Sequence, residues 1–194
     1  MRRPAGGHDG DVAQGLGTPD HSVEVVEHDP RWAADFAAIA GLLRRCVPEA
    51  VVVEHVGSTS VPGMAAKPTI DVLLVVDDLG SVLSRVDELT GLGFDHRPRA
   101  FPDEPDHLFL RRVVDGKRTH HLHVLRAGSP EIEEYRFFRD HLIAHPEVAA
   151  FYAETKRGLA AHYPTDRLRY VEAKSAVVAA ILAEARGEPL PGEA

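Results

Sequence analysis

The sequence predicts an α+β fold in which helices flank a mixed β-sheet and a helical segment closes the chain. Two continuous apolar runs, at 51–53 and 69–76, indicate strands that are buried on both faces. Two further strand-like runs surround Asp115-Gly116, a dipeptide typical of a tight antiparallel reversal. From Ser129 onward the pattern becomes helical. Helix-separated strands followed by a hairpin together predict a mixed sheet.

Size and composition predict a single domain. The chain has 194 residues, of which 44% are hydrophobic and 27% are charged, so it can bury one substantial core. We expect this domain over residues 21–187, with a sheet core at about 21–127 and C-terminal helices at about 128–187. The single cysteine, Cys46, excludes an intrachain disulfide framework and a multi-thiolate zinc site.

The two ends of the sequence lack a periodic apolar pattern. Residues 1–20 are rich in Gly, Pro, Asp and His and predict a disordered N-terminal tail, and residues 188–194 predict a frayed tail. No apolar segment follows Met1-Arg2-Arg3, and no run approaches transmembrane length. We therefore expect a cytoplasmic protein without a membrane partner.

The chain carries a net charge of −8, from 30 acidic and 22 basic residues. A long polyanion would meet unfavourable average electrostatics, so an extended nucleic-acid surface is not expected. One mononucleotide held by a local loop and a lysine is compatible with this charge, because local fields can oppose the average.

The first half of the domain is predicted to alternate helices and strands. A helix is expected at about Pro30–Cys46, because capping signals precede apolar residues at three- and four-residue spacing. The β-branched segment Val51–Val53 and the run Thr69–Val76 follow as strands. A second helix is expected at Leu79–Leu92, where glycines end the helical spacing.

The second half is predicted to contain the hairpin and three helices. Its strands are expected at His107–Val114 and Thr119–Leu125. Prolines break the helical segment at His145-Pro146 and Tyr163-Pro164. The last helix is expected at about Asp166–Ala185.

A small-residue loop follows the first strand at Gly57-Ser58-Thr59-Ser60. Glycine lets a ligand approach the backbone, and hydroxyl and N–H groups donate to phosphate oxygens. Lys67 lies immediately before the next strand and can reach back over the loop. An ordinary strand-to-helix turn with Ser and Thr caps is the alternative. The predicted phosphate- or nucleotide-binding residues here are Gly57, Ser58, Thr59, Ser60 and Lys67.

Asp71 interrupts an otherwise apolar strand close to this loop. An ionised carboxylate there is costly unless a metal, a cation or backbone donors compensate it, which indicates a metal-bridged nucleotide site. An ion pair with Lys67 or an arginine is the alternative. Residues two apart in a strand share a face, so a second carboxylate would be expected at position 73, which is Leu73.

His121 and His123 share one face of the later strand and can bind a metal or carry protons. Surface-facing histidines or a core hydrogen-bond network explain them equally well. Glu54 and His55 alternate just before the loop, and we choose His55 as the residue that faces the site. The predicted metal ligands are Asp71, His121, His123 and His55.

Two Tyr-x-x-x-Lys pairs, Tyr152 with Lys156 and Tyr170 with Lys174, each align on one helix face. Solvated helix surface with half-buried tyrosines is the alternative for each pair. Together, Arg139, Lys156 and Lys174 could form a basic wall that binds a phosphate-bearing ligand.

Five separated blocks resemble the GrpB family over about residues 23–185, namely HVGSTSVPGMAAKPTIDVLL, THHLHV, FRDHLIAHPE, YAETKRGLA and YVEAK. The blocks agree in order and in spacing, so the resemblance is specific. It implies a nucleotidyltransferase-like fold related to the DNA polymerase β superfamily. It also implies a possible dephospho-coenzyme A kinase partner, because some bacteria fuse this domain to that enzyme.

In the nucleotidyltransferase superfamily, a Gly-Ser pair binds the nucleotide phosphates. An Asp-x-Asp motif on one strand, with a third carboxylate farther on, binds two magnesium ions. Gly57-Ser58 and Asp71 match this pattern. Leu73 replaces the second aspartate, and the HHLHV strand offers histidine where a carboxylate is expected. A two-metal mechanism therefore lacks one bridging ligand here.

Three functions are compatible with these residues. The first is a nucleotidyltransferase-like domain that binds a nucleotide or coenzyme A-type phosphate ligand with Mg²⁺ or Mn²⁺ and transfers a nucleotidyl group. Asp71 and His123 would be its catalytic residues. The second is a catalytically inactive relative that acts as a ligand-binding or accessory module linked to coenzyme A biosynthesis, which Leu73 favours. The third is a transition-metal hydrolase that uses Asp71 and the histidines.

Overall fold

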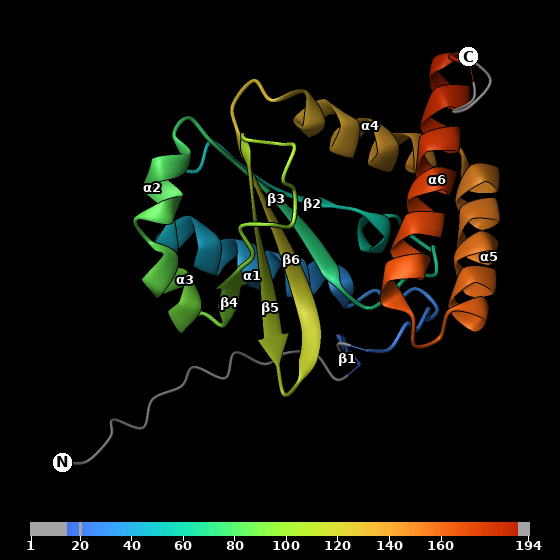
Figure 1. Cartoon of the computed structure of the whole chain (residues 1–194), viewed down its shortest axis with the longest axis horizontal. Coiled ribbons are helices and arrows are strands. Elements are labelled where there is room, and N and C mark those ends of the chain that lie inside the picture. The colour runs from blue at the N-terminus through green and yellow to red at the C-terminus, as the bar shows by residue number, and fades with distance from the viewer. Residues whose placement is uncertain (1–14, 20, 190–194) are drawn as a thin grey trace.

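A central β-sheet organises the fold, and helices cover both of its faces (Figure 1). The computed structural model describes residues 15–19 and 21–189. The strands lie in the order β2-β3-β6-β5-β4, and β1 pairs with the first residues of β6. The strands are β1 (Thr18–Pro19), β2 (Val52–Val56), β3 (Ile70–Val76), β4 (Phe94–His96), β5 (His107–Val114) and β6 (Lys117–Arg126).

The predicted mixed sheet is confirmed. β3 and β6 run parallel, whereas β2 with β3, β5 with β6 and β4 with β5 are antiparallel. The parallel pair joins two segments about fifty residues apart along the chain, so β3 and β6 lie side by side at the centre of the sheet. This pairing places the Asp71 strand beside the HHLHV strand.

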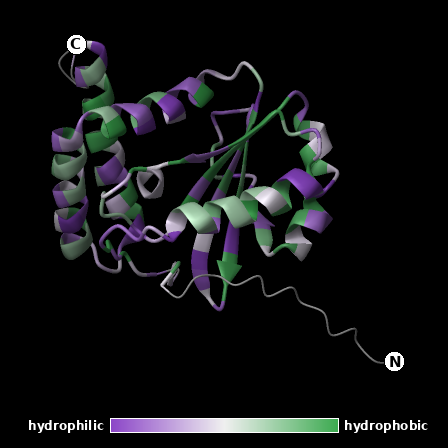
Figure 2. Cartoon of the chain, turned by 180° about the vertical axis from the view of Figure 1, so that it is seen from behind, coloured by the Kyte–Doolittle hydropathy of each residue, from purple (hydrophilic) through white to green (hydrophobic). Residues whose placement is uncertain are grey.

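Within the described residues, six α-helices lie in two layers around the sheet. α1 to α3 cover one face, where Trp32 and Leu43 pack with Val72 and Leu122 in the main core. Seen from behind, α1 crosses in front of strands that are hydrophobic along much of their length (Figure 2). The helices are α1 (Trp32–Cys46), α2 (Leu79–Leu83), α3 (Val86–Gly91), α4 (Pro130–Ala144), α5 (Pro146–His162) and α6 (Arg167–Arg186).

The opposite face of the sheet carries the candidate site. Side chains alternate along β3, so Val72 faces the α1 side, while Leu73 and Val75 pack against Ile132 of α4. α5 and α6 pack beside α4, which closes this end of the molecule (Figure 1). The predicted C-terminal helical segment is thereby confirmed. No helix in the described part of the chain is long and apolar enough to cross a membrane.

The helix expected at Leu79–Leu92 is in fact two short helices. In a continuous helix the N–H of Arg85 would donate to the carbonyl of Ser81, but here it donates to Val82. The Arg85 guanidinium instead donates a hydrogen bond to the Ser81 carbonyl, at 2.8 Å. This side chain satisfies the end of α2 and separates it from α3.

The N-terminal boundary of the fold is also corrected. β1 pairs Thr18 with Arg118, and Leu16 is buried in the main core, so residues 15–19 pack on the fold and do not belong to a disordered tail. Pairing with a distant strand gives these residues order that their composition does not predict. β4, which pairs with β5, was not expected either. The rest of the predicted N-terminal tail, up to residue 14 and at residue 20, and residues 190–194 lie outside the described residues.

Candidate metal and phosphate site

The loop after β2 forms a single 3₁₀ turn, Ser58–Ser60, that begins at Gly57. Gly57 has a φ of 70° and, together with Ser58, lines a large cavity. The Ser60 hydroxyl donates to the Gly57 carbonyl at 2.6 Å, and buried Thr59 donates to the Thr69 carbonyl at 3.3 Å. The hydroxyls of Thr59 and Ser60 therefore stabilise the turn. Of the four loop residues that were predicted to bind phosphate, Gly57 and Ser58 line the cavity.

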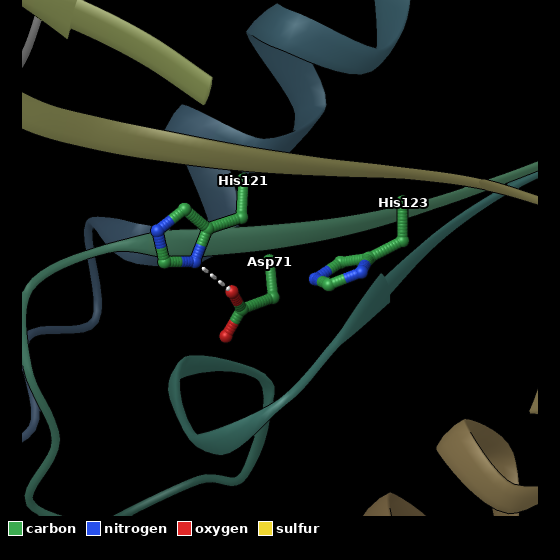
Figure 3. Close-up of side chains that lie close together, drawn as sticks. All are labelled: Asp71, His121 and His123. Carbon is green, nitrogen blue, oxygen red and sulfur yellow. Dashed lines mark hydrogen bonds and ion pairs between the residues drawn. The ribbon is translucent and has the colours of Figure 1, made fainter. Parts of the chain in front are cut away.

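Asp71 lies directly beside this turn. In the sheet it pairs with Val56 on one side and His121 on the other. Its Oδ1 is 2.7 Å from Nδ1 of His121. Figure 3 shows the rings of His121 and His123 on either side of the Asp71 carboxylate. One potential ligand atom from each of the three residues lies within 4.8 Å of the other two.

Burial and hydrogen bonding set the protonation states of this cluster. Burial is the largest single influence on Asp71 and raises its pKa, but the hydrogen bond with His121 and the nearby His121, His123 and Lys174 together outweigh it and hold that pKa below its usual range. Burial lowers the pKa of His121 and lowers that of His123 to about 3. A carboxylate with two neutral imidazoles is the state in which these side chains bind a metal, and the proton that Nδ1 of His121 donates to Asp71 must move to Nε2 of the same ring before Nδ1 can coordinate.

The donor set decides which metal ions suit the cluster. Magnesium prefers oxygen ligands, whereas imidazole suits zinc, iron and related ions. Leu73 lies on the same face as Asp71 but is fully buried against Val75, Leu125 and Ile132. Two imidazoles and one carboxylate therefore fit a transition metal such as Mn²⁺, Fe²⁺ or Zn²⁺ and do not fit a magnesium pair.

The structure does not bring His55 to the cluster. His55 pairs with Val72, so it lies on the face of the sheet opposite Asp71. Its ring stacks on Phe36 with a centroid distance of 4.8 Å, and its Nε2 lies 3.0 Å from the Thr59 hydroxyl. Burial lowers the pKa of His55 to about 4. Because strand alternation turns His55 away from the cluster, its ring contacts Thr59 and supports the loop instead.

The cavity over this face of the sheet has a volume of about 1080 Å³ and extends to α4, α5 and α6. Its charged lining is mainly basic, although the chain is acidic overall. The basic residues are Lys67, Arg97, Arg99, Arg111, Arg118, Lys156, Arg167 and Lys174, against the acidic residues Asp71, Glu104, Glu131 and Glu134. Such a lining favours an anionic ligand.

Both predicted Tyr–Lys pairs line this cavity. Lys156 is buried, donates to the Ala65 carbonyl at 2.7 Å and lies 4.5 Å from the centroid of the Tyr152 ring. Lys67 lies 5.4 Å from the centroid of the Tyr170 ring. Burial lowers the pKa of each lysine to about 7. A phosphate bound beside either amine would raise the pKa of that amine again.

Arg139 does not join this basic wall. Its guanidinium donates to Glu54 at 3.0 Å, to the His55 carbonyl at 3.2 Å and to Asp140 at 2.7 Å. Arg136 of the same helix donates to Glu54 as well, at 2.6 Å. The two arginines connect α4 to β2. Of the three residues predicted to form the basic wall, Lys156 and Lys174 line the cavity.

A second layer of residues around His123 was not predicted. Nδ1 of His123 lies 3.0 Å from Nε2 of His107 and 2.9 Å from the Tyr135 hydroxyl. Nδ1 of His107 lies 2.5 Å from a Glu104 carboxylate oxygen. The available signal was that His107 begins the strand expected to pair with the HHLHV strand.

The family model described as GrpB protein matches residues 22–184. The chain belongs to the GrpB family. It is 41% identical to the UPF0157 protein PA4798 of Pseudomonas aeruginosa, over 86% of this chain and 69% of that protein. It is 42% identical to the UPF0157 protein BH1888 of Halalkalibacterium halodurans, over 84% of this chain and 83% of that protein.

A solved structure supports the same fold for this GrpB-family chain. The conserved protein GrpB from Enterococcus faecalis superposes on 80% of this chain and 97% of its own length, with a TM-score of 0.71 and 29% identity. A cytoplasmic RNA terminal U-transferase superposes on 71% of this chain and 40% of its own length at a TM-score of 0.46 and 16% identity. A score at that level does not establish a common fold.

One further relative has a more specific name. A dephospho-CoA kinase of Mycolicibacterium paratuberculosis is 28% identical over 78% of this chain and 43% of its own length. The similarity thus covers less than half of that protein.

Proposed function

We propose that this GrpB-family domain is a metal-dependent enzyme. It would bind a nucleotide, or another phosphate-bearing ligand that contains a nucleotide, and transfer the nucleotidyl group of that ligand. One observation carries the proposal: Asp71, His121 and His123 converge beside Gly57 on the wall of a large basic cavity. A metal site next to several cations is suited to a phosphate ester, whose charge both can neutralise.

The residues divide into two groups in this proposal. Asp71, His121 and His123 would hold the metal, which, when bound, would stabilise negative charge on a phosphate oxygen. Gly57 and Ser58 offer backbone N–H groups at the start of the 3₁₀ turn. The basic residues that neutralise the remaining phosphate charge are Lys67, Lys156 and Lys174.

A ligand-binding module without catalysis is the second candidate, and Leu73 favours it. The residue fills the position of a second carboxylate with a packed apolar side chain. A coenzyme A-type ligand, or a dephospho-coenzyme A kinase partner, is supported by the name of the related kinase. In that case the cavity would bind its ligand without turnover.

A transition-metal hydrolase is the third candidate, and the donor set favours it. Two imidazoles and one carboxylate leave coordination positions open for water on zinc, iron or manganese. The reaction would then transfer the phosphate group to water rather than to another acceptor.

Metal binding and turnover together distinguish the three candidates. Mn²⁺, Zn²⁺ and Mg²⁺ binding would be measured by calorimetry for the natural chain, Asp71→Asn and Asp77→Asn. Asp77 is an exposed carboxylate at the end of the same strand, which makes it a matched control. We expect Mn²⁺ or Zn²⁺ to bind to the natural chain and to Asp77→Asn, and we expect this binding to be lost in Asp71→Asn. If neither metal binds to the natural chain, the protein is not a metal-dependent enzyme of this kind.

Turnover is measured with the loaded protein, nucleoside triphosphates and a panel of acceptors. Pyrophosphate release together with a nucleotidylated acceptor supports the transferase. Release of phosphate or pyrophosphate without an acceptor product supports the hydrolase. Ligand-induced thermal stabilisation with no product supports the binding module.

A further inference from the structure

A hydrogen-bonded chain runs from the rim of the cavity to His123. Glu104 lies in the loop before β5, lines the cavity, and has 35% of its side chain exposed. Its carboxylate contacts His107, whose ring is buried and in turn contacts His123. Tyr135 of α4 contacts the same nitrogen of His123.

Local structure holds the first two members of this chain in place. The N–H of Glu104 donates to the Phe101 carbonyl at 3.3 Å, and the N–H of His107 donates to the Glu104 carbonyl at 3.1 Å. The Phe101 ring stacks on His107 with a centroid distance of 3.9 Å. Neither the Glu104 backbone nor the His107 ring can turn away without breaking these contacts.

The chemistry of the members gives the chain a direction. An ionised carboxylate only accepts hydrogen bonds, so Nδ1 of His107 must carry the proton that faces Glu104. Neutral His107 then presents Nε2 as an acceptor, and Nδ1 of His123 supplies the proton between the two rings. Nε2 of neutral His123 is left with its lone pair, and Figure 3 shows this outer nitrogen pointing toward Asp71.

We propose that Glu104 and His107 are positioning residues that fix His123 in the Nδ1–H tautomer and so direct its Nε2 lone pair toward a metal at Asp71. The inference deepens the proposed function, because it rests on the metal site. The opposite tautomer would point an N–H group at the metal and block coordination. A partner on the non-coordinating nitrogen of a histidine ligand typically changes metal affinity by roughly 10- to 100-fold.

The first test needs no metal and reads the tautomer directly. NMR spectra of the imidazole nitrogens of the isotopically labelled, metal-free chain at about pH 8 distinguish a protonated from an unprotonated ring nitrogen. We expect His123 to be protonated at Nδ1 in the natural chain and to populate the other tautomer in Glu104→Ala and His107→Phe. A His123 protonated at Nε2 in the natural chain would overturn the proposal.

Three further variants separate positioning from packing and charge. Glu104→Gln keeps an oxygen acceptor and should retain the natural tautomer, whereas Glu131→Ala removes a carboxylate from the same cavity and should change nothing. Tyr135→Phe removes the other contact to His123. A tautomer that responds to Tyr135→Phe and not to Glu104→Ala would assign the role to Tyr135 and overturn the proposal.

The second test measures Mn²⁺ affinity by calorimetry, with thermal unfolding of each variant as a check of folding. We expect affinity to fall roughly 10- to 100-fold in Glu104→Ala and to stay near the natural value in Glu104→Gln and Glu131→Ala. Unchanged affinity in Glu104→Ala would contradict the inference. Absence of Mn²⁺ binding in the natural chain would instead refute the metal-dependent function, while the NMR result would still decide the tautomer.

Discussion

A Cβ atom placed on Gly57 would lie 2.3 Å from Oδ2 of Asp71. The loop and the carboxylate therefore approach so closely that any side chain at position 57 would displace Asp71. The φ of 70° at Gly57 adds a conformational reason for glycine, because this region disfavours residues with a Cβ. The same contact makes the loop and the metal cluster one unit.

Gly57→Ala should consequently weaken metal binding as well as stability. We expect a loss of about 1–2 kcal/mol from the positive φ, and a loss of Mn²⁺ affinity of at least about tenfold because Asp71 must move. Gly63→Ala is the matched control, since Gly63 has a φ of 77° and no atom within 4 Å of an added Cβ. Equal effects of the two variants on Mn²⁺ affinity would contradict the coupling.

Leu73→Asp should create a protein that depends on metal for its stability. Leu73 is fully buried on the same face as Asp71, so an unpaired carboxylate there should cost about 2–5 kcal/mol. Mn²⁺ should restore part of the loss, measured as a rise in Tm, because the new carboxylate can join the metal ligands. Leu73→Asn controls for polarity, and the same Tm rise in both variants would argue against a shared ligand position.

Anion binding should weaken as pH rises above 7. Lys67 and Lys156 have pKa values lowered to about 7, so without an anion both amines lose their charge as the pH rises through about 7, whereas amines that contact a bound anion keep their charge toward their usual pKa of 10.5. An anion favours the charged amines, so binding must take up protons in this window and is strongest below pH 7. The loss should reach at most about tenfold per pH unit for each lysine that titrates.

Sulfate is a suitable probe for this pH dependence, because it does not itself titrate in the same range. Its affinity would be measured by calorimetry at a series of pH values for the natural chain and for Lys67→Met with Lys156→Met combined. The double variant should show weaker and flatter binding. A natural chain whose affinity is constant or rises with pH would show that these two lysines do not contact the anion.

Arg139 and Lys174 should behave differently on substitution. Arg139→Ala breaks the contacts from α4 to Glu54 and to the His55 carbonyl, so we expect a loss of about 1–3 kcal/mol in unfolding free energy with sulfate affinity nearly unchanged. Lys174→Ala should weaken sulfate binding with little effect on stability, because Lys174 lines the cavity. Chemical denaturation and calorimetry together check both, and a larger affinity loss in Arg139→Ala would reverse the assignment.

Local sequence signals predicted much of the fold. The continuous apolar run of β3 and the three proline-separated helices α4 to α6 were predicted to within a few residues, because hydrophobic periodicity and proline act locally. The strand alternation rule also predicted that His121 and His123 share a face. It could not decide between Glu54 and His55, since alternation does not say which face the site occupies.

The register of the β5–β6 hairpin shows why the contact between His107 and His123 could not be predicted from the sequence. The two-residue turn, counted without interruption, would pair Leu108 with His123 and leave His107 on the opposite face. An irregularity after Arg112 shifts the register by one residue, so Phe109 pairs with His123 and His107 shares its face. No residue type near this position predicts the shift in register.

The sequence by itself determined the class of the fold, the Gly57–Ser58 loop and the histidine pair, because each depends on residues close together in the chain. Tertiary structure decided the rest. Parallel pairing of β3 with β6 brought Asp71 to His121, and docking of α5 and α6 added the lysines to the same cavity. Packing also removed His55 and Arg139 from the site, since contacts between distant segments decide what a side chain faces.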